Sequence, residues 1–203
     1  MTDAEYVGNI GFPDVFYVTR KPDNMDYEVL EIGAGDRRFA GRFLQYAIVT
    51  DGDESRAQII GIGIDAICLA EILPFCDRTF QRVIANNPYG YGFRYEKDAE
   101  SLLLSVRKVL RKDGVFVILA SNRNPYCLRS RVVQFAGKFG FHVMNQPDVR
   151  PSDVYPGHVF FASDGFTPVV PDFMIRTYAV DVVVRFVNPL VVRATMRLHV
   201  KQE

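Results

Sequence analysis

The chain has 203 residues, of which 48% are hydrophobic and 24% are charged. These proportions are typical of a globular protein, and the length suits one domain with an appendage. The 24 Lys and Arg residues balance the 24 Asp and Glu residues, so the formal net charge is zero. Proteins that bind duplex nucleic acid carry a basic face, so this balance argues against a nucleic-acid partner.

The chain shows no sign of a targeting segment, a membrane span or a metal site. Its start lacks the pattern of a signal peptide. The longest apolar runs, such as "VFVILA", fall far short of the about 20 residues that span a membrane. The three cysteines and three histidines lack the spacing of metal ligands. We expect a cytoplasmic protein with reduced thiols and packed or surface histidines, His158 among them.

Residues 1–26 contain glycines and prolines with aromatic residues between them, which predicts an irregular arm or lid. Residues 27–166 then alternate short apolar runs with amphipathic segments. The expected strands are Tyr27–Ile32, "QYAIVT", "IDAICL", "QRVIANN", "GVFVILAS", "FHVMNQ" and "HVFFASDG". The expected helices are Arg37–Leu44, Glu54–Ile60, Glu96–Leu110 and Tyr126–Phe139. This order predicts an α/β fold with a doubly wound, mostly parallel sheet and right-handed crossovers.

Residues 167–203 break the alternation of strands and helices. Two segments around Asn188-Pro189 alternate apolar and polar residues, which predicts a β-hairpin or strand pair. We expect a C-terminal β-rich appendage outside the core fold. Because an exposed sheet edge invites pairing, this extension should pack on the core or on a second copy in a homodimer.

The expected strand ends carry the candidate site. Gly33 and Gly35 allow a tight turn and a close approach of the backbone to a ligand. Asp51 or Asp53, at the end of the next strand, can accept hydrogen bonds from both ribose hydroxyls. Carboxyl ends of parallel strands share one edge, where nucleotides bind. A dinucleotide loop needs a third glycine where Arg38 stands, which argues against NAD.

Four segments in succession resemble the class I S-adenosylmethionine-dependent methyltransferases. They are "LEIGAGDRRFA", "VTDGDES", "AEILPFCDRTFQRVIANNPYG" and "VLRKDGVFVILAS", and the likeness covers about residues 27–165. The resemblance implies an enzyme that uses S-adenosylmethionine. It places Glu31, Gly33, Ala34 and Gly35 along the methionine and ribose side of the cofactor. Asp51, with Asp53 as the competing choice, would bind the ribose.

By the same resemblance, Glu71 and Ile72 would approach the adenine, and Asn86 would lie where methyl donor and acceptor meet. Two positions depart from the family pattern. Arg37 stands where another glycine is common, and Leu69 stands where an acid often binds the adenine amino group. These departures leave open a non-catalytic structural or regulatory subunit with the same fold.

The segment Asn86-Asn87-Pro88-Tyr89 resembles the Asn-Pro-Pro-Tyr loop of methyltransferases that modify amino or amide nitrogens. There, Asn86 and a backbone carbonyl would accept the nitrogen's hydrogen bonds, Pro88 would fix the loop and Tyr89 would stack on the acceptor. The segment also fits an ordinary strand-end turn. Methylation of an oxygen in a small molecule is the alternative, although the sequence identifies no base for it.

Arg123, Arg129, Arg131 and Lys138 fall close together in the sequence. They fit either a contact for an anionic ligand or a solvated helix face. The methyl acceptor itself, a small molecule or a protein, is not evident from the sequence.

Overall fold

The computed structural model describes residues 28–35, 39, 43–44, 46–57, 63–144, 150–161 and 167–179. Its strands are β1 (Val29–Ile32), β2 (Ala47–Asp51), β3 (Ala66–Ile67), β4 (Phe80–Asn86), β5 (Leu110–Ala120), β6 (Phe141–Met144), β7 (Phe160–Phe161), β8 (Pro168–Val169) and β9 (Phe173–Ala179). Its helices are α2 (Glu54–Ala57), α3 (Glu96–Val109), α4 (Arg129–Lys138) and α5 (Pro151–Val154). The predicted arm over 1–26 and most of the predicted helix Arg37–Leu44 lie outside the described residues.

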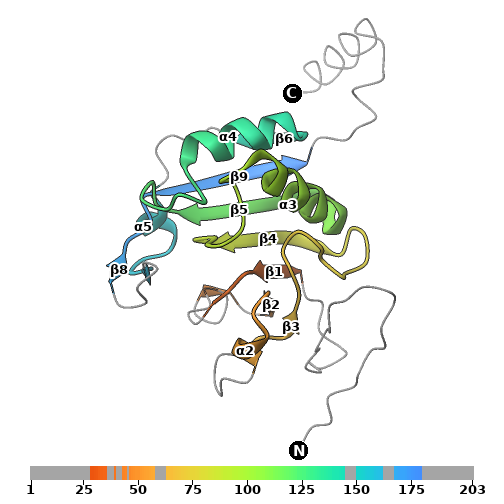
Figure 1. The fold of residues 1–203 in the computed structure, drawn as a ribbon, viewed down its shortest axis with the longest axis horizontal. Helices are drawn as coiled ribbons and strands as arrows, with labels where there is room; N and C mark the ends of the chain where they lie inside the picture. Colours follow the sequence, from red (N-terminus) through yellow and green to blue (C-terminus); the bar gives the residue numbers. More distant parts are fainter. Residues whose placement is uncertain are drawn as a thin grey trace, which may run out of the picture.

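Seven strands form one sheet in the order β3-β2-β1-β4-β5-β9-β6 (Figure 1). The first five strands are mutually parallel, with β1 paired to β2 on one side and to β4 on the other. From β1 the chain adds β2 and then β3 on one side of the sheet. It then crosses back and adds β4 and β5 on the other side of β1. The strand order reverses between β1 and β4, and a ligand is expected at the carboxyl ends of the strands near this reversal.

The central strands β1, β4 and β5 are apolar over most of their paired residues because both faces of the sheet are covered there. On one face, Val83, Ala85, Phe116 and Ile118 pack with the buried side of α3 and α4, including Leu102. Helices α3 and α4 lie side by side over this face (Figure 1).

The opposite face of the sheet carries the alternate residues of the same strands. Ile84, Val117 and Leu119 pack there against Phe39 and Tyr155. The period of two along each strand thus assigns every side chain to one of the two layers. The doubly wound, mostly parallel α/β sheet predicted from the sequence is confirmed.

The strand β9 corrects the expectation that the chain beyond residue 167 lies outside the core fold. It is antiparallel and internal, paired with β5 from Val115↔Tyr178 to Ala120↔Phe173 and with β6 from Phe141↔Ala179 to Met144↔Arg176. Alternating apolar residues indicate a strand but not its position in a sheet, because that position depends on distant partners. Residues 180–203 lie outside the described residues, so the rest of the predicted extension stays a prediction.

Three expected elements differ in length. In the described part of the run "HVFFASDG", residues 158–161, the structure has the short β7, which pairs with β8 in a separate two-stranded sheet. The third strand is limited to Ala66–Ile67. The strand expected to begin at Gly114 begins instead at Leu110, and its register with β4 shifts between Phe80↔Leu110 and Arg82↔Val115.

Candidate functional site

The loop after β1 is the first part of the candidate site. Gly33 and Gly35 have φ values of 60° and 61°, in the left-handed region that favours glycine. Between them Ala34 is buried and donates its amide hydrogen to the Thr50 carbonyl at 3.0 Å. The glycine spacing seen in the sequence is therefore a backbone requirement of this turn.

Asp51, at the end of β2, connects the ends of the first two strands. Its Oδ2 accepts a hydrogen bond from the Gly35 amide at 2.7 Å, and its Oδ1 accepts one from the Asp53 amide at 2.9 Å. The side chain is 8% exposed. The structure therefore brings Gly33, Gly35 and Asp51 together, as the sequence predicted.

Asp53 lies next to Asp51 but has a different environment. Its Oδ1 accepts hydrogen bonds from both the amide and the hydroxyl of Ser55, at 3.0 and 2.7 Å, and the residue is exposed. This geometry is that of a turn before α2. Of the two competing aspartates, Asp51 is the one directed toward the glycine loop.

Glu31 is fully buried on the face of β1 opposite Leu30 and Ile32. Its Oε1 accepts the Phe39 amide hydrogen at 2.8 Å. Such a bond compensates part of the cost of burying a carboxylate. Glu31 thus anchors the chain that follows the glycine loop, and its predicted contact with the cofactor stays a prediction.

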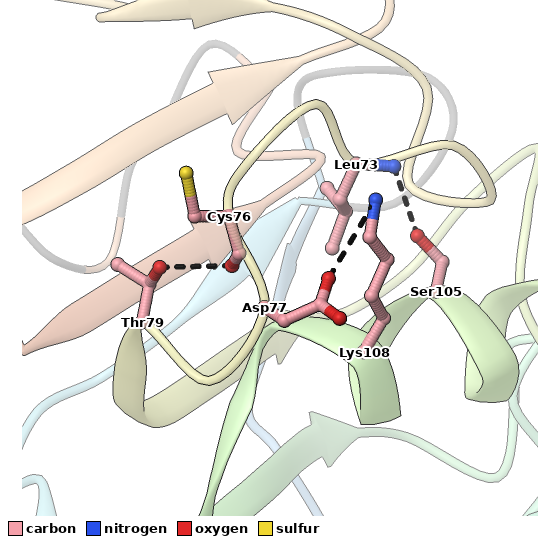
Figure 2. Close-up of polar contacts among 6 residues, drawn as sticks. All are labelled: Leu73, Cys76, Asp77, Thr79, Ser105 and Lys108. Carbon is pink, nitrogen blue, oxygen red and sulfur yellow. Dashed lines mark hydrogen bonds and ion pairs between the residues drawn. The ribbon is translucent and has the colours of Figure 1, made fainter.

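The turn after β3 carries Glu71 and Ile72 and is fixed to α3. The Leu73 amide donates to the Ser105 hydroxyl at 2.9 Å (Figure 2). Farther along the same connection, Thr79 bonds the Cys76 carbonyl at 2.8 Å, and Lys108 lies 4.0 Å from the Asp77 carboxylate. These contacts attach the connection between β3 and β4 to the end of the helix that packs on the sheet.

The turn after β3 presents apolar side chains beside Asp51. Leu69 and Ile72 are 45% and 48% exposed, and a Cβ placed on Gly52 would lie 3.1 Å from Leu69 Cδ2. Glu71 is half-buried, and burial raises the pKa of its carboxyl above the usual value. The carboxyl end of β2 is therefore flanked by an exposed apolar edge and a partly desolvated acid.

Tyr91 is a member of the site that the sequence did not identify. Its hydroxyl donates to the Ile32 carbonyl at 2.8 Å, and its ring lies directly over Gly33. Burial raises the pKa of the Tyr91 phenol well above 10, and the nearby charges of Asp51, Glu71 and Glu31 raise it further. Gly90 and Gly92 flank Tyr91 and have φ values of 86° and 108°. These two glycines are the feature of the sequence that could have pointed to an unusual loop at Tyr91.

The loop after β4 departs from the Asn-Pro-Pro-Tyr pattern in its backbone. Asn87 has a φ of 52°, whereas a proline is fixed near −65°. Its side-chain oxygen accepts a hydrogen bond from Asn124 Nδ2 at 2.8 Å, and so does the Pro88 carbonyl. The segment therefore matches the Asn-Pro-Pro-Tyr pattern in the order of its residues, but its backbone at Asn87 has a conformation that proline cannot adopt.

Asn86 and Tyr89 point to different partners. Asn86 is 7% exposed, and its Oδ1 lies 2.8 Å from Nε2 of His158. Tyr89 is 51% exposed, and its ring centroid lies 4.8 Å from that of Tyr126. The Asn86 oxygen that the sequence assigned to an acceptor nitrogen is thus bonded within the protein.

His158 is a packed histidine, as expected, but its partner was not foreseen. It is 6% exposed, and its ring meets those of Phe39 and Phe43 edge to face, at centroid distances of 4.9 and 5.4 Å. Only the tertiary structure brings it to Asn86, 72 residues away in sequence. Because an amide oxygen only accepts, Nε2 of His158 carries the hydrogen in this bond.

Three further expectations concern the described residues. Those residues hold no group of three or more potential metal ligands and no helix long and apolar enough to cross a membrane. All three cysteines are free, with Cys68 and Cys127 buried and Cys76 exposed.

Two of the basic residues that fall close together in the sequence have partners within the protein. Lys138 pairs with Glu96, and Arg131 donates to the Arg94 carbonyl at 2.6 Å.

Comparison with known proteins identifies relatives of the fold. No family model matches the chain. Over 142 residues it is 31% identical to the ubiquinone/menaquinone biosynthesis C-methyltransferase UbiE of Desulfotalea psychrophila. This match covers 64% of the chain and 56% of the relative, so the chain spans little more than half the length of that protein.

Solved structures give the same assignment of the fold. A SAM-dependent methyltransferase of Thermotoga maritima has a TM-score of 0.51 and 18% identity, covering 75% of this chain and 82% of the other. The YcgJ protein of Bacillus subtilis has a TM-score of 0.52 and 16% identity, and the match covers 77% of this chain and 93% of that protein. A TehB-like methyltransferase of Corynebacterium glutamicum has a TM-score of 0.51 and 17% identity, and the match covers 77% of this chain and 81% of that protein. The fold resemblance inferred from the sequence is confirmed.

Proposed function

We propose that this chain, whose fold is that of the class I S-adenosylmethionine-dependent methyltransferases, binds S-adenosylmethionine and transfers its methyl group to a small molecule. The observation that carries the proposal is the 2.7 Å bond between the Gly35 amide and Asp51 Oδ2. It joins the glycine loop to an acid at the next strand end, where the strand order reverses. The similarity to UbiE, a C-methyltransferase by name, supports the same reaction class.

The cofactor side offers chemistry suited to a nucleoside with an amino-acid tail. Each Asp51 oxygen accepts one backbone hydrogen bond, and a carboxylate has about four acceptor positions, so both oxygens would also accept from ribose hydroxyls. Leu69 and Ile72 would contact the faces or edge of the adenine, and Glu71 would take the place of the missing acid. The backbone of Gly33, Ala34 and Gly35 would run beside the methionine part.

Tyr91 favours the second candidate function, a methyltransferase-like subunit without catalysis. Its ring covers Gly33, on the side where the resemblance places the methionine part of the cofactor. In an active protein we expect the ring to turn away or to line the cofactor, with Gly90 and Gly92 absorbing the backbone change. In a non-catalytic relative the ring would stay and exclude the ligand.

The contacts on the acceptor side argue against an amino or amide nitrogen held by two carbonyl groups. Asn86 Oδ1 is bonded to His158, and the Pro88 carbonyl is bonded to Asn124. The methyl group of a sulfonium is already activated, so the protein mainly has to align the acceptor with the sulfur–methyl bond. The acceptor lone pair forms the new bond, and the electrons of the broken bond remain on sulfur. His158 lies against Asn86, near the expected transfer point. It is a candidate for the general base that the sequence alone did not identify.

Isothermal titration with S-adenosylmethionine and S-adenosylhomocysteine tests the proposal. We expect saturable heat with a Kd in the range of about 1 μM to 1 mM, the span of typical enzyme KM values. Asp51→Ala should weaken binding strongly and Asp53→Ala only slightly. Absence of heat for the unaltered protein at millimolar ligand would favour the non-catalytic subunit.

A second experiment identifies the class of acceptor. The protein is incubated with methyl-labelled S-adenosylmethionine and cell extract divided into small-molecule, protein and RNA fractions. We expect label in the small-molecule fraction only. Asn86→Ala should reduce transfer while cofactor affinity stays near that of the unaltered protein. Label in the protein fraction would contradict the small-molecule acceptor.

A further inference from the structure

Four residues beside the β4 loop form a cluster, here called the Tyr–Arg surface: the exposed Tyr89, Arg94 and Tyr95 and the half-buried Tyr126. Tyr89 and Tyr95 are 51% and 57% exposed, and Arg94 is also exposed. Isolated exposed aromatic side chains are ordinary, but adjoining ones around a cation are a feature of binding surfaces.

The Arg94 guanidinium lies between two rings. Its Cζ is 5.2 Å from the centroid of Tyr95 and 5.3 Å from that of Tyr126, both within cation–π range. Its Nη1 also donates to the Tyr126 hydroxyl at 3.4 Å. Tyr89 extends the row, because its ring contacts that of Tyr126 at 4.8 Å with an interplanar angle of 54°.

Hydrogen bonds hold this surface against the loop that ends β4. Asn124 Oδ1 accepts the Tyr126 amide at 2.9 Å, while Asn124 Nδ2 donates to Pro88 and Asn87. On the other side, the Phe93 amide donates to the Tyr126 carbonyl at 2.6 Å. The backbone on both sides of the row is therefore fixed before any ligand arrives, which lowers the entropy cost of binding.

The surface carries an excess of positive charge. Among the described residues, neither the Arg94 nor the Arg131 guanidinium is paired with a carboxylate; the polar partner of Arg94 is a phenol and that of Arg131 is the Arg94 carbonyl. The nearby Glu96 carboxylate is engaged by Lys138. An arginine has five donor hydrogens in a planar fork, so Arg94 has donors left for an anion.

We propose that the Tyr–Arg surface binds the methyl acceptor, and that this acceptor is a planar aromatic ring bearing a carboxylate or phosphate. The ring stacks on Tyr89 and Tyr126, and the anion pairs with Arg94. Stacking on the tyrosine rings and charge-assisted bonding to the guanidinium select both features at once. The inference rests on the proposed function, because it takes the end of β4 as the transfer point.

The test titrates the full chain, saturated with S-adenosylhomocysteine and labelled with ¹³C-tyrosine, with four probes followed by NMR. Benzoate and phenyl phosphate carry both features, cyclohexanecarboxylate lacks the aromatic ring, and inorganic phosphate lacks any ring. We expect the Tyr89, Tyr95 and Tyr126 signals to shift with at least one aromatic anion. Tyr46, which is 56% exposed elsewhere, should not respond. The better of the two aromatic probes identifies the anionic group.

Matched variants separate recognition from general charge. Arg94→Gln and Tyr89→Ala should each weaken binding of the preferred aromatic anion by about tenfold. Arg78→Gln, an exposed arginine at the opposite end of β4, should leave binding unchanged. Equal binding of benzoate and cyclohexanecarboxylate, an unchanged affinity in Arg94→Gln, or no response to either aromatic anion would overturn the proposal.

Failure of this inference is distinguishable from failure of the proposed function. Calorimetric binding of S-adenosylhomocysteine without any response of the Tyr–Arg surface would refute the acceptor class and leave the cofactor site intact. If S-adenosylhomocysteine does not bind, the same titration without it still measures the surface. A response there would leave the aromatic-anion site standing without its role in methyl transfer.

Discussion

The loops after β1 and after β4 end neighbouring strands at the same edge of the sheet, but they use different parts of the chain. The β1 loop places two glycines at positive φ and ties a backbone amide to Asp51. The β4 loop places Asn87 at positive φ and ties side-chain amides and an imidazole together. The β1 loop therefore depends mainly on its backbone conformation and on one carboxylate, whereas the β4 loop depends on several side chains.

The largest effect that would test this comparison is expected at Gly33. An added Cβ would lie 2.4 Å from Tyr91 Cε1, and the φ of 60° disfavours any L side chain. Overpacking and backbone strain together predict that Gly33→Ala lowers the free energy of unfolding by about 2–5 kcal/mol. Urea denaturation measures it.

Two controls make the Gly33 prediction sharper. Gly35 has the same backbone conformation but no atom within 4 Å of an added Cβ, so Gly35→Ala should cost only about 1–2 kcal/mol. Adding Tyr91→Ala to Gly33→Ala should recover part of the loss in a double-mutant cycle. Equal losses for the two glycines would contradict the steric role of Tyr91.

Asp51→Ala is expected to have the next largest effect. It removes the acceptor of two backbone amides, and bonds to a charged group contribute about 1.5–3 kcal/mol each. We expect a loss of roughly 2–3 kcal/mol of stability, because water reaches part of the vacated site. Replacing the exposed Asp53 by alanine should lower the free energy of unfolding by less than about 1 kcal/mol, the cost of losing a weak helix cap. Similar losses at both positions would remove the distinction between them.

His158 tests the side-chain network of the other loop. His158→Phe keeps the ring packing but leaves the buried Asn86 oxygen without this donor, which should cost about 1–3 kcal/mol. His158→Gln can supply a donor and should retain more stability and more methyl transfer. Cofactor affinity should change little in either variant. A phenylalanine variant as stable and as active as the glutamine variant would show that the bond has no role.

The smallest effect concerns Cys68, which follows β3. Burial raises the pKa of its thiol from 9.0 to about 12, so the folded state keeps the thiol protonated where the unfolded state ionises. The contribution of this thiol to stability is constant below pH 9 and falls as the pH rises from 9 toward 12, which amounts to roughly 1.4 kcal/mol between pH 8 and pH 10. Comparing unfolding at pH 8 and pH 10 with that of Cys68→Ala measures this; an identical pH dependence would contradict it.

The cofactor side was more predictable than the acceptor side. The sequence placed Gly33, Gly35 and either Asp51 or Asp53 at one edge because the ends of adjacent parallel strands must meet, and the structure shows that Asp51 is the one bonded to the glycine loop. Tyr91 was missed because its approach to Gly33 depends on how a loop 58 residues later turns over the sheet. The backbone of Asn87 was missed because a sequence match to Asn-Pro-Pro-Tyr does not report φ.

The sequence by itself determined the alternation of strands and helices, the two-layered burial and the glycine turn, because these depend on local periodicity and local backbone freedom. The tertiary structure alone decided that β9 lies inside the sheet, that His158 bonds Asn86 and that Tyr91 covers Gly33. Each of these joins segments far apart in the chain, and which distant segments meet is settled by packing of the whole fold and not by any one segment.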